Sequence, residues 1–344
     1  MTITRAINPH HPEPDIILEA AAIIRRGGLV AFPTETVYGL GANGLESSAV
    51  QRIFAVKERP SSDPLILHLA SAADLERVAV LDKREEIVSR LAAAFMPGAL
   101  TLVLPKRAHV PPEVTAGGET VAARVPAHPV AHALIDAAGV PIAAPSANLF
   151  SRPSPTSAQA VLEDLDGRVD LVLDGGEAQI GVESTVLSLV GAPTLLRPGG
   201  VDLEDLERMI GEVLLPGEAA LDVRTAQPAP GMLLKHYSPR ARLLLLEHGA
   251  DLETRLQAMA RAAQGERLGL LLPSSSLKAL ESFPAERFDL GDTPAAIASR
   301  LFTGMRALDT AGCTAILAHR FAPHGLGRAL NDRLFRAASG HVML

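Results

Sequence analysis

Short apolar runs alternate with amphipathic helical stretches over the first 213 residues of the chain. Each apolar run is four to six residues long, which is typical of a buried strand. The predicted strands are 29–32, 65–69, 100–104, 121–125, 141–144, 169–173 and 185–190. Apolar residues at helical spacing predict helices at 15–26, 49–57, 84–95, 128–138, from 157, and at 203–213. Residues before 15 form a polar tail that is interrupted by prolines.

The pattern changes after residue 213. Residues 214–240 are rich in proline and glycine, which indicates a stiff and irregular linker. Beyond it, predicted strands at 243–246, 268–272 and 314–318 alternate with helices near 251–264, 293–309 and 326–338. This alternation predicts a small Rossmann-like α/β domain with a largely parallel sheet. We therefore expect a catalytic domain at 12–213, a linker or lid at 214–240, and a C-terminal domain at 241–344 that supports the first or binds a partner.

The stretch LVAFPTETVYGLG, residues 29–41, is the most informative part of the first domain. Pro33 ends the strand, and hydroxyl and carboxylate side chains follow it into a glycine-rich turn. Such a turn either builds a pocket or merely connects a strand to a helix. Its glycines at 39, 41 and 44 match the spacing of a dinucleotide fingerprint. We discount that match, because the fingerprint must open a helix directly and the next helix is expected near Ser47 or Ser48.

Composition narrows the class of protein. The chain has 344 residues, of which 47% are hydrophobic and 21% charged, as in an ordinary globular protein of two domains. Its net charge of -7 argues against nonspecific coating of nucleic acid. A single cysteine, Cys313, allows no internal disulfide and is expected to be a buried thiol in a reducing compartment. No apolar run reaches the ~18 residues of a membrane span and no signal peptide is evident, so we expect a cytoplasmic protein.

Several polar residues interrupt or follow the predicted strands of the first domain. A serine after a strand is usually a cap, and a strand histidine such as His68 is usually a satisfied core residue. An arginine inside a strand, such as Arg124, must instead be paired or face a cavity. Together, the cations and hydroxyls of this set suit a polyanion such as a nucleoside triphosphate. The sequence lacks the lysine loop of an ordinary P-loop site. Its cations are Lys57, Arg59, Arg124 and Arg197, and its hydroxyls are Thr34, Thr36, Thr120, Ser146, Ser154, Ser184 and Thr185.

Several segments, in this order, resemble the threonylcarbamoyl-AMP synthase family, whose domain is called YrdC-like. They are PTETVYGLG (33–41), KERPSSDPLILHLAS (57–71), PGALTLVL (97–104), VAARVPAHPVA (121–131), APSANLFSRPSPT (144–156), ESTVL (183–187) and LLRPGG (195–200). The segment APGMLLKHYSP (229–239) resembles the linker of the longer branch of the family, which has an extra C-terminal domain. The resemblance implies a twisted, mixed α/β sheet with a basic concave pocket.

The resemblance also implies a reaction. This family makes threonylcarbamoyl-AMP and pyrophosphate from L-threonine, bicarbonate and ATP, with Mg2+ accompanying ATP and with no protein metal site. The product serves a downstream tRNA threonylcarbamoyl transferase, which modifies the adenosine beside the anticodon, and RNA is a further expected contact. By motif, L-threonine would be held by Thr36, His68, Arg124, Ser184 and the backbone of Ala144. ATP would be held by Arg59, Asp63, Thr120, Ser146, Ser154, Arg197 and Tyr237, and the catalytic cations would be Lys57 and Arg59.

Two positions depart from the family pattern. Asp63 stands where the family usually has asparagine, and a carboxylate there repels a triphosphate unless it faces adenine, a ribose or a metal. Phe150 and Ser151 stand where Ser-Gly is usual, so that loop is expected to be less flexible. Tyr237, in a proline-stiffened segment, is expected to belong to a lid over the pocket, the alternative being a segment that only packs between domains.

Three other functions remain to be weighed. A nicotinamide dehydrogenase would depend on the discounted glycine triplet. A nonenzymatic RNA-binding module would depend on the basic concavity. A carbamoyl-transfer protein of hydrogenase maturation shares the domain, but it is expected to have zinc-finger segments, and this sequence has no pair of cysteines.

Overall fold

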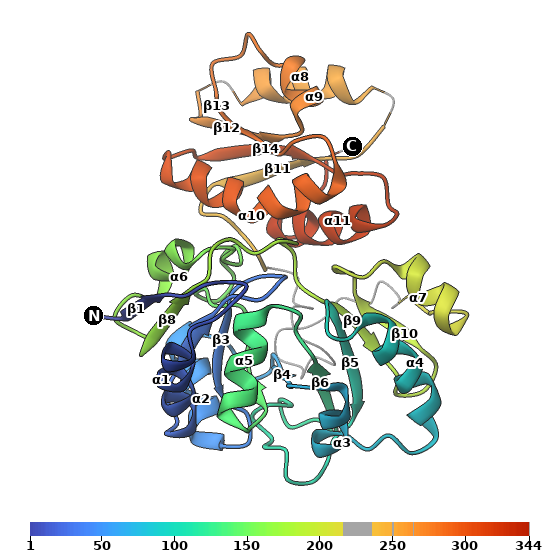
Figure 1. Cartoon of the computed structure of the whole chain (residues 1–344). Coiled ribbons are helices and arrows are strands. Elements are labelled where there is room, and N and C mark those ends of the chain that lie inside the picture. The colour runs from blue at the N-terminus through green and yellow to red at the C-terminus, as the bar shows by residue number, and fades with distance from the viewer. Residues whose placement is uncertain (216–235, 250, 264, 344) are drawn as a thin grey trace.

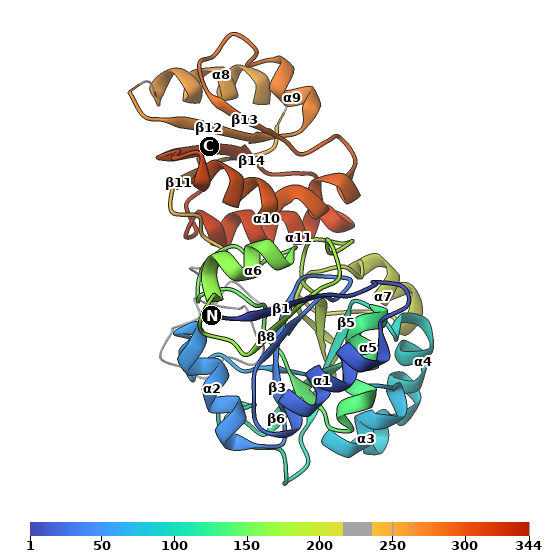
Figure 2. The same cartoon turned by 60° about the vertical axis from the view of Figure 1, so that its left-hand side comes forward.

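The computed structural model describes residues 1–215, 236–249, 251–263 and 265–343. Two sheets lie one above the other in the described chain, each with helices on both sides (Figures 1 and 2). The larger sheet has ten strands in the order β1-β8-β2-β3-β7-β4-β6-β5-β9-β10, and its pairs are both parallel and antiparallel. The predicted mixed α/β fold with a second, smaller sheet is therefore confirmed.

The apolar runs of the first domain form the central strands of the large sheet, because only strands covered on both faces read as continuous apolar sequence. Its strands are β1 (Ile3–Ala6), β2 (Val30–Phe32), β3 (Gly39–Asn43), β4 (Ile66–His68), β5 (Leu100–Pro105), β6 (Thr120–Arg124), β7 (Ile142–Ala143), β8 (Leu171–Asp174), β9 (Thr185–Ser188) and β10 (Thr194–Arg197). Its α-helices are α1 (Pro14–Arg25), α2 (Ser47–Lys57), α3 (Leu75–Val78), α4 (Glu85–Phe95), α5 (Pro129–Ala138), α6 (Ala158–Leu165) and α7 (Leu203–Ile210).

Two apolar cores cover the two faces of this sheet. Helices α1 and α5 pack on one face, over β2, β7 and β8. Helices α2, α4, α6 and α7 contribute to the core on the other face. On β4, β5, β6 and β9 a further small cluster contains only Ile66, Val103, Ala122 and Val186 as fully buried members. This part of the sheet borders the pocket described below.

The polar N-terminal tail contains a strand that the sequence analysis did not predict. Residues Ile3–Ala6 form β1, an edge strand that pairs in parallel with β8, from Ile3 opposite Leu171 to Ala6 opposite Asp174. All four side chains of β1 are exposed, so backbone hydrogen bonds hold it in place and no apolar pattern marks it. The first domain accordingly begins before residue 12.

The glycine triplet is not a dinucleotide loop. Gly39 and Gly41 lie inside β3, which pairs with β2 on one side and β7 on the other. The following helix begins at Ser47, where it was predicted. A strand interior cannot offer its backbone amides to a pyrophosphate as a strand-to-helix turn does, so this basis for a dehydrogenase is removed.

The C-terminal domain has a parallel sheet in the order β11-β14-β12-β13. Its elements are β11 (Arg242–Leu246), α8 (Leu252–Ala262), β12 (Leu268–Leu272), α9 (Ser274–Lys278), β13 (Glu286–Asp289), α10 (Pro294–Thr310), β14 (Ala315–His319) and α11 (Leu326–Ala337). The parallel α/β prediction is confirmed, and Cys313 is buried as expected. Strand β13 and helix α9 escaped prediction, because β13 is a mostly exposed edge strand and α9 has only five residues.

Helices α10 and α11 lie between the C-terminal sheet and the first domain, whereas α8 and α9 lie on the far side (Figures 1 and 2). Val37 and Val182 of the first domain belong to the same buried cluster as the core residues of α10 and α11. Gly181 lies so close to α10 that a Cβ atom there would overlap the backbone of Ala298 and Ser299. The two domains thus pack directly against each other.

Most of the predicted linker lies outside the described residues, which resume at His236. The linker and lid at 214–240 therefore stay a prediction. Among the described residues, no helix is both long and apolar enough to cross a membrane.

Candidate functional site

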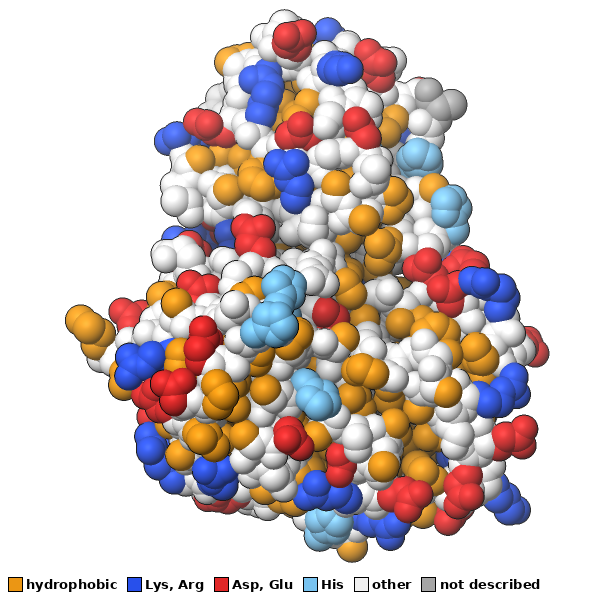
Figure 3. All heavy atoms as spheres, in the orientation of Figure 1, with side chains coloured by type: hydrophobic (Ala, Val, Ile, Leu, Met, Phe, Trp, Pro, Cys, Tyr) orange, Lys and Arg blue, Asp and Glu red, His pale blue; other side chains and the backbone are white. Residues whose placement is uncertain are grey.

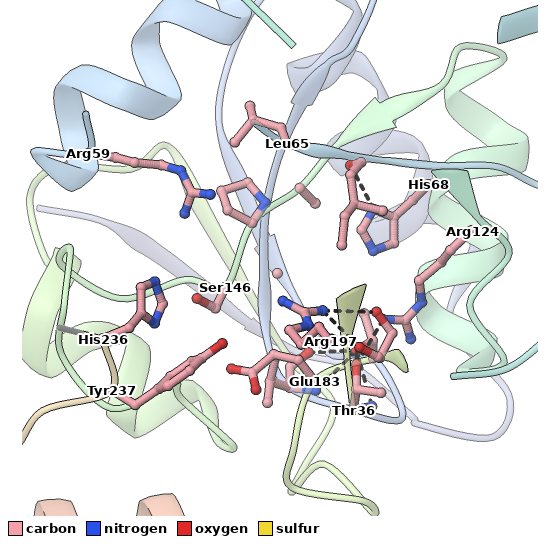
Figure 4. Close-up of a pocket in the computed structure, with 17 residues that line it drawn as sticks. Thr36, Arg59, Leu65, His68, Arg124, Ser146, Glu183, Arg197, His236 and Tyr237 are labelled. Atoms are coloured by element: carbon pink, nitrogen blue, oxygen red, sulfur yellow. Dashed lines mark hydrogen bonds between the residues drawn. The ribbon is translucent and has the colours of Figure 1, made fainter. Parts of the chain in front are cut away.

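A pocket lies in the first domain, where the ends of β4, β6 and β10 meet the loop after β2 and the residues that follow the linker (Figure 4). It is open to solvent, and the empty space in it together with the adjoining solvent is about 520 Å³. It is lined by Thr34, Thr36, Val37, Gly39, Arg59, Leu65, Ile66, His68, Arg124, Ala144, Pro145, Ser146, Glu183, Ser184, Arg197, His236 and Tyr237. Three arginines and one carboxylate thus line it, which makes it a basic pocket.

The arginines of this pocket are buried and not spread over the molecular surface. Arg59, Arg124 and Arg197 are all buried. On the face shown in Figure 3, apolar side chains gather in the middle of the first domain, and the lysines and arginines lie mainly towards its edges. A pocket with buried cations favours a small anionic ligand over the extended backbone of a nucleic acid.

Arg124 ends β6 and reaches the loop after β2, as Figure 4 shows. Its Nη2 lies 2.6 Å from Glu35 Oε1, and its Nη1 donates to Thr36 Oγ1 over 3.0 Å. Thr34 Oγ1 shapes the loop by donating to the carbonyl of Val37 over 2.6 Å. The strand arginine is therefore both paired and directed into a cavity, which is what its burial requires.

His68 stands beside Arg124, because β4 and β6 pair with these two residues in register. Its Nδ1 lies 3.2 Å from the carbonyl oxygen of Ile66. Burial and the neighbouring Arg124 lower the pKa of His68 to about 3. The ring is therefore a neutral hydrogen-bonding group, which suits the hydroxyl of a small ligand better than a charge.

Arg59 follows α2 and points into the pocket from the side opposite Arg124 (Figure 4). Its Nε donates to the carbonyl of Asp63 over 3.1 Å, and its Nη2 lies 2.9 Å from Asp63 Oδ2. Asp63 is fully buried and does not line the pocket. The aspartate that departs from the family pattern thus orients and partly neutralises Arg59 behind the pocket wall.

Lys57 is not among the residues that line the pocket. The structure places it behind the pocket, and its Nζ donates to the carbonyl oxygens of Ser146 and Asn148 over 2.6 and 2.5 Å. Burial and the neighbouring Arg59 hold the pKa of Lys57 well below its usual value. In this structure Lys57 therefore holds the loop that bears Ser146, and the catalytic role expected of it stays a prediction.

Arg197, at the end of β10, completes the basic lining. Its Nε and Nη2 donate to the carbonyl of Ser184 over 3.1 and 2.9 Å. Ser184 Oγ lies 2.8 Å from Thr101 Oγ1. A Cβ atom at Gly199 would overlap the backbone of residues 183–185, so only glycine lets this turn pack so closely. Ser184 and Arg197 are thereby fixed to each other.

Glu183 and Tyr237 connect the pocket to the C-terminal domain. Glu183 Oε1 accepts from Ser154 Oγ over 2.5 Å, and Glu183 Oε2 accepts from Arg333 Nε of α11 over 2.6 Å. The ring of Tyr237 stacks on Phe302 of α10 with centroids 5.4 Å apart, and in Figure 4 its hydroxyl points towards the pocket. The last residues of the linker region are therefore part of the pocket wall.

The loop at Phe150 and Ser151 is attached to the same segment. The Ser151 carbonyl accepts from the Ser238 amide over 2.7 Å, and the Phe150 ring meets the His236 ring edge-on at 5.8 Å. Ser151 has a φ of 66°, a conformation that glycine adopts more readily than serine. The serine in this loop thus keeps a backbone shape suited to glycine.

Most of the predicted site residues come together in the pocket, and four do not line it. Those that do are Thr36, Arg59, His68, Arg124, Ala144, Ser146, Ser184, Arg197 and Tyr237. Lys57, Asp63 and Ser154 support the wall from behind. Thr120 begins β6, the strand that ends at Arg124, and pairs with Pro105.

Sequence analysis missed Glu35, Glu183 and His236 as site residues. Glu35 and Glu183 lie inside motifs that were recognised, so the demand of a buried arginine for a carboxylate could have pointed to them. His236 adjoins Tyr237, and burial and the neighbouring Arg59 hold its pKa well below the usual value. Within the described residues, no group of three acidic, histidine or cysteine side chains is placed to bind a metal ion.

Two family models match the chain. One, Sua5_yciO_yrdC, described as telomere recombination, matches residues 22–199. The other, described as the C-terminal domain of threonylcarbamoyl-AMP synthase, matches residues 201–339. Together they account for both sheets of the structure.

Similar proteins share nearly the full length of the chain. The threonylcarbamoyl-AMP synthase of Pyrococcus abyssi is 47% identical over 94% of both chains. That of Bacillus subtilis is 41% identical over 99% of this chain and 97% of its own. The crystal structure of P. abyssi Sua5 with L-threonine has a TM-score of 0.92 at 43% identity and covers 99% of each chain. The chain therefore belongs to the threonylcarbamoyl-AMP synthase family, in the branch that has the additional C-terminal domain.

Proposed function

We propose that the pocket binds L-threonine and ATP side by side and joins them, through bicarbonate, into threonylcarbamoyl-AMP. Three buried arginines, Arg59, Arg124 and Arg197, converge on one pocket, and this observation carries the proposal. Both reactants are anionic where they must meet, and the arginines reduce their mutual repulsion. Pyrophosphate leaves as the second product.

The Arg124 side of the pocket suits L-threonine. The guanidinium can accept a carboxylate, and neutral His68 with the Thr36 hydroxyl can bond the threonine side chain. The Ala144 amide already donates to the carbonyl of Ile66, which leaves the Ala144 carbonyl for the threonine amino group. Ser184 lies between this side and Arg197, and the bound L-threonine of the similar P. abyssi structure is consistent with this choice of ligand.

The Arg59 side suits ATP. Arg59, Ser146, Arg197 and Tyr237 line the pocket there and offer two cations, a hydroxyl and an aromatic ring. Lys57, Asp63 and Ser154 hold these groups in place, and we assign them no direct contact with the nucleotide. Thr120 stays a predicted nucleotide contact.

The chemistry needs position more than a reactive protein group. The amine of threonine captures CO2 derived from bicarbonate to give a carbamate, and a carbamate oxygen then attacks the α-phosphorus of ATP. The P–O bond to pyrophosphate breaks, and Arg59 and Arg197 neutralise the charge that develops. Holding two reactants in attacking geometry can account for much of the acceleration.

Mg2+ would accompany ATP. Glu183 is the one carboxylate among the described lining residues, and both of its oxygens already accept hydrogen bonds, from Ser154 and Arg333. The residues present therefore offer little to a protein-bound ion, and the phosphate oxygens of ATP would hold it.

The activity is tested by measuring pyrophosphate release from ATP with L-threonine or bicarbonate omitted in turn. We expect release to require both. Equal release without L-threonine would contradict the proposal. We further propose that the product passes to a tRNA threonylcarbamoyl transferase in the cytoplasm, and that contact with RNA, if any, occurs during this transfer.

A further inference from the structure

We propose that Arg333 of the C-terminal domain is a positioning residue for the pocket of the first domain, acting through Glu183 and Tyr237. This inference rests on the proposed function and deepens it, because it gives the C-terminal domain a part in the reaction. Arg333 lies in α11 and does not itself line the pocket. It acts from directly behind the lining.

The contacts of Arg333 converge on pocket residues. Its Nε donates to Glu183 Oε2 over 2.6 Å, and its Nη2 donates to the carbonyl of Pro198 over 3.1 Å. Its guanidinium carbon lies 5.1 Å from the centre of the Tyr237 ring. Pro198 directly follows Arg197, so one side chain from α11 fixes three separate parts of the pocket wall.

Arg333 is completely buried between the two domains. Its side chain is 0% exposed, and its remaining nitrogen, Nη1, donates a hydrogen bond to Asp332 Oδ2 over 2.5 Å. Burying an ion pair gains little stability over a well-packed apolar residue. The arginine fork does, however, give one fixed geometry to every group that it contacts. Precise placement of the pocket wall is therefore the better explanation for this side chain.

Arg333 also changes the charge seen by the substrates. Glu183 is the carboxylate of the pocket lining, and its charge would repel the phosphates of ATP. Arg333 compensates that charge through the ion pair between its Nε and Glu183 Oε2, which lie 2.6 Å apart. Without Arg333, the ring of Tyr237 would lose one of its neighbours, and Glu183 would be free to turn towards Arg197.

Arg306 provides a matched comparison. It lies in α10, is also buried, and crosses the same domain interface to Asp164 Oδ2 at 2.7 Å and to the Pro153 carbonyl at 2.5 Å. Neither Asp164 nor Pro153 lines the pocket. If an interface arginine matters only for holding the domains together, Arg306 and Arg333 should be equivalent.

The experiment compares Arg333→Met, Arg333→Lys and Arg306→Met in the full-length protein. We expect Arg333→Met to lower kcat/KM for ATP at least about 10-fold, since a displacement of about 1 Å can cost up to ~100-fold. Arg333→Lys keeps the charge but not the fork, so its loss should be intermediate. Arg306→Met should keep kcat/KM within about 3-fold of the parent, although it too should lower the melting temperature, because it removes a partner of buried Asp164.

Two further readouts separate positioning from general stability. The chain has no tryptophan and two tyrosines, both buried, so acrylamide quenching of tyrosine emission reports their exposure. Quenching should rise in Arg333→Met and not in Arg306→Met, because Tyr38 belongs to a separate core and bonds Gly176. Adding Glu183→Gln to Arg333→Met should lower kcat/KM by a smaller factor than Glu183→Gln does in the parent protein, because the two residues act as one unit.

The outcomes are distinct. An inactive parent protein would count against the proposed function, not against the role of Arg333. With an active parent, the positioning role is overturned if Arg333→Met keeps full kcat/KM, or if Arg306→Met loses as much. If Arg333→Met does not fold, the comparison of Arg333→Lys with Arg306→Met decides in the same way.

Discussion

Arg124 and Glu35 form a buried ion pair of 2.6 Å at the edge of the pocket, which Arg124 lines and Glu35 does not, with side chains only 4% and 8% exposed. The second carboxylate oxygen of Glu35 has no hydrogen-bond partner among the described protein groups. The arginine proposed to bind the threonine carboxylate is therefore already shared with a protein carboxylate. Binding of L-threonine must compete with, or rearrange, this pair.

This relationship gives opposite predictions for the two partners. Arg124→Ala should weaken L-threonine binding by roughly 10-fold to 100-fold, since a charge-assisted contact is worth about 1.5–3 kcal/mol. It should also destabilise the fold by about 3–5 kcal/mol, because Glu35 is left as a buried unpaired charge. Glu35→Gln should instead preserve or strengthen L-threonine binding. Calorimetric titration with L-threonine, beside denaturant unfolding, measures both effects.

The control is ATP. Its affinity should change less than about 3-fold in both variants, because Arg124 is assigned to the other side of the pocket. Equal losses of L-threonine and ATP affinity in Arg124→Ala would contradict the division of the pocket.

The Arg59–Asp63 pair predicts the reverse preference. Arg59→Ala should lower the affinity for ATP by about 10-fold or more, and the affinity for L-threonine much less. Asp63→Asn removes the partner's charge while keeping its shape, so Arg59 should attract the triphosphate more strongly. ATP titrations of both variants at low and high salt test this, because the gain in Asp63→Asn should shrink as salt screens the charge. Weaker ATP binding in Asp63→Asn would show instead that the carboxylate itself serves the nucleotide.

Much of the fold could be predicted from the sequence, because buried strands and amphipathic helices leave regular apolar patterns. The edge strands β1 and β13 left no such pattern, since all four side chains of each are exposed or partly exposed and backbone pairing holds them. Their existence depends on a neighbouring strand that offers a free edge, which is a property of the assembled sheet.

The candidate site shows the same limit. Motifs identified the residues that line the pocket, but they did not separate Lys57, which bonds carbonyls behind the wall, from Arg59, which faces the cavity. Arg333 lies in a helix with many charged residues and resembles part of a solvated face. Arg333 is buried only because α11 packs against the first domain, where its partner Glu183 lies 150 positions away in the sequence.

The histidines predict how stability depends on pH. The pKa of His68 is about 3 in the folded protein, below the usual value of about 6.5, so the unfolded chain binds a proton that the folded chain does not. His68 therefore costs no stability above pH ~6.5. Below that pH, the free energy of unfolding falls by about 1.4 kcal/mol per pH unit because of this group, until the pH nears 3. His236 adds a change of the same sign, since its pKa is also lowered.

Urea unfolding at several pH values between 7 and 5 measures this slope. His68→Gln should reduce the slope by about one proton. An unchanged slope in His68→Gln would mean that this imidazole becomes protonated in the folded state as readily as in the unfolded chain.

The last prediction concerns Tyr237, the end of the expected lid. Its ring is buried between Phe302 and Arg333, and its φ of 60° is unfavourable for a residue with a side chain. Such a conformation persists only where the surroundings hold it, and it is common at functional sites. Removing the C-terminal domain would be a blunt test of this segment, because Val37 and Val182 are buried against that domain.

Tyr237→Phe is a sharper test, because it keeps the ring contacts and removes only the hydroxyl that points into the pocket. If the hydroxyl contacts the nucleotide, ATP affinity should fall about 3-fold to 10-fold, the range of a neutral hydrogen bond, at an unchanged melting temperature. Tyr237→Ala should lose more affinity and also stability, since it removes buried aromatic packing. ATP titration and thermal unfolding of both variants separate these effects. If Tyr237→Phe binds ATP as the parent does while Tyr237→Ala unfolds early, the segment is a packing element between the domains and not a lid.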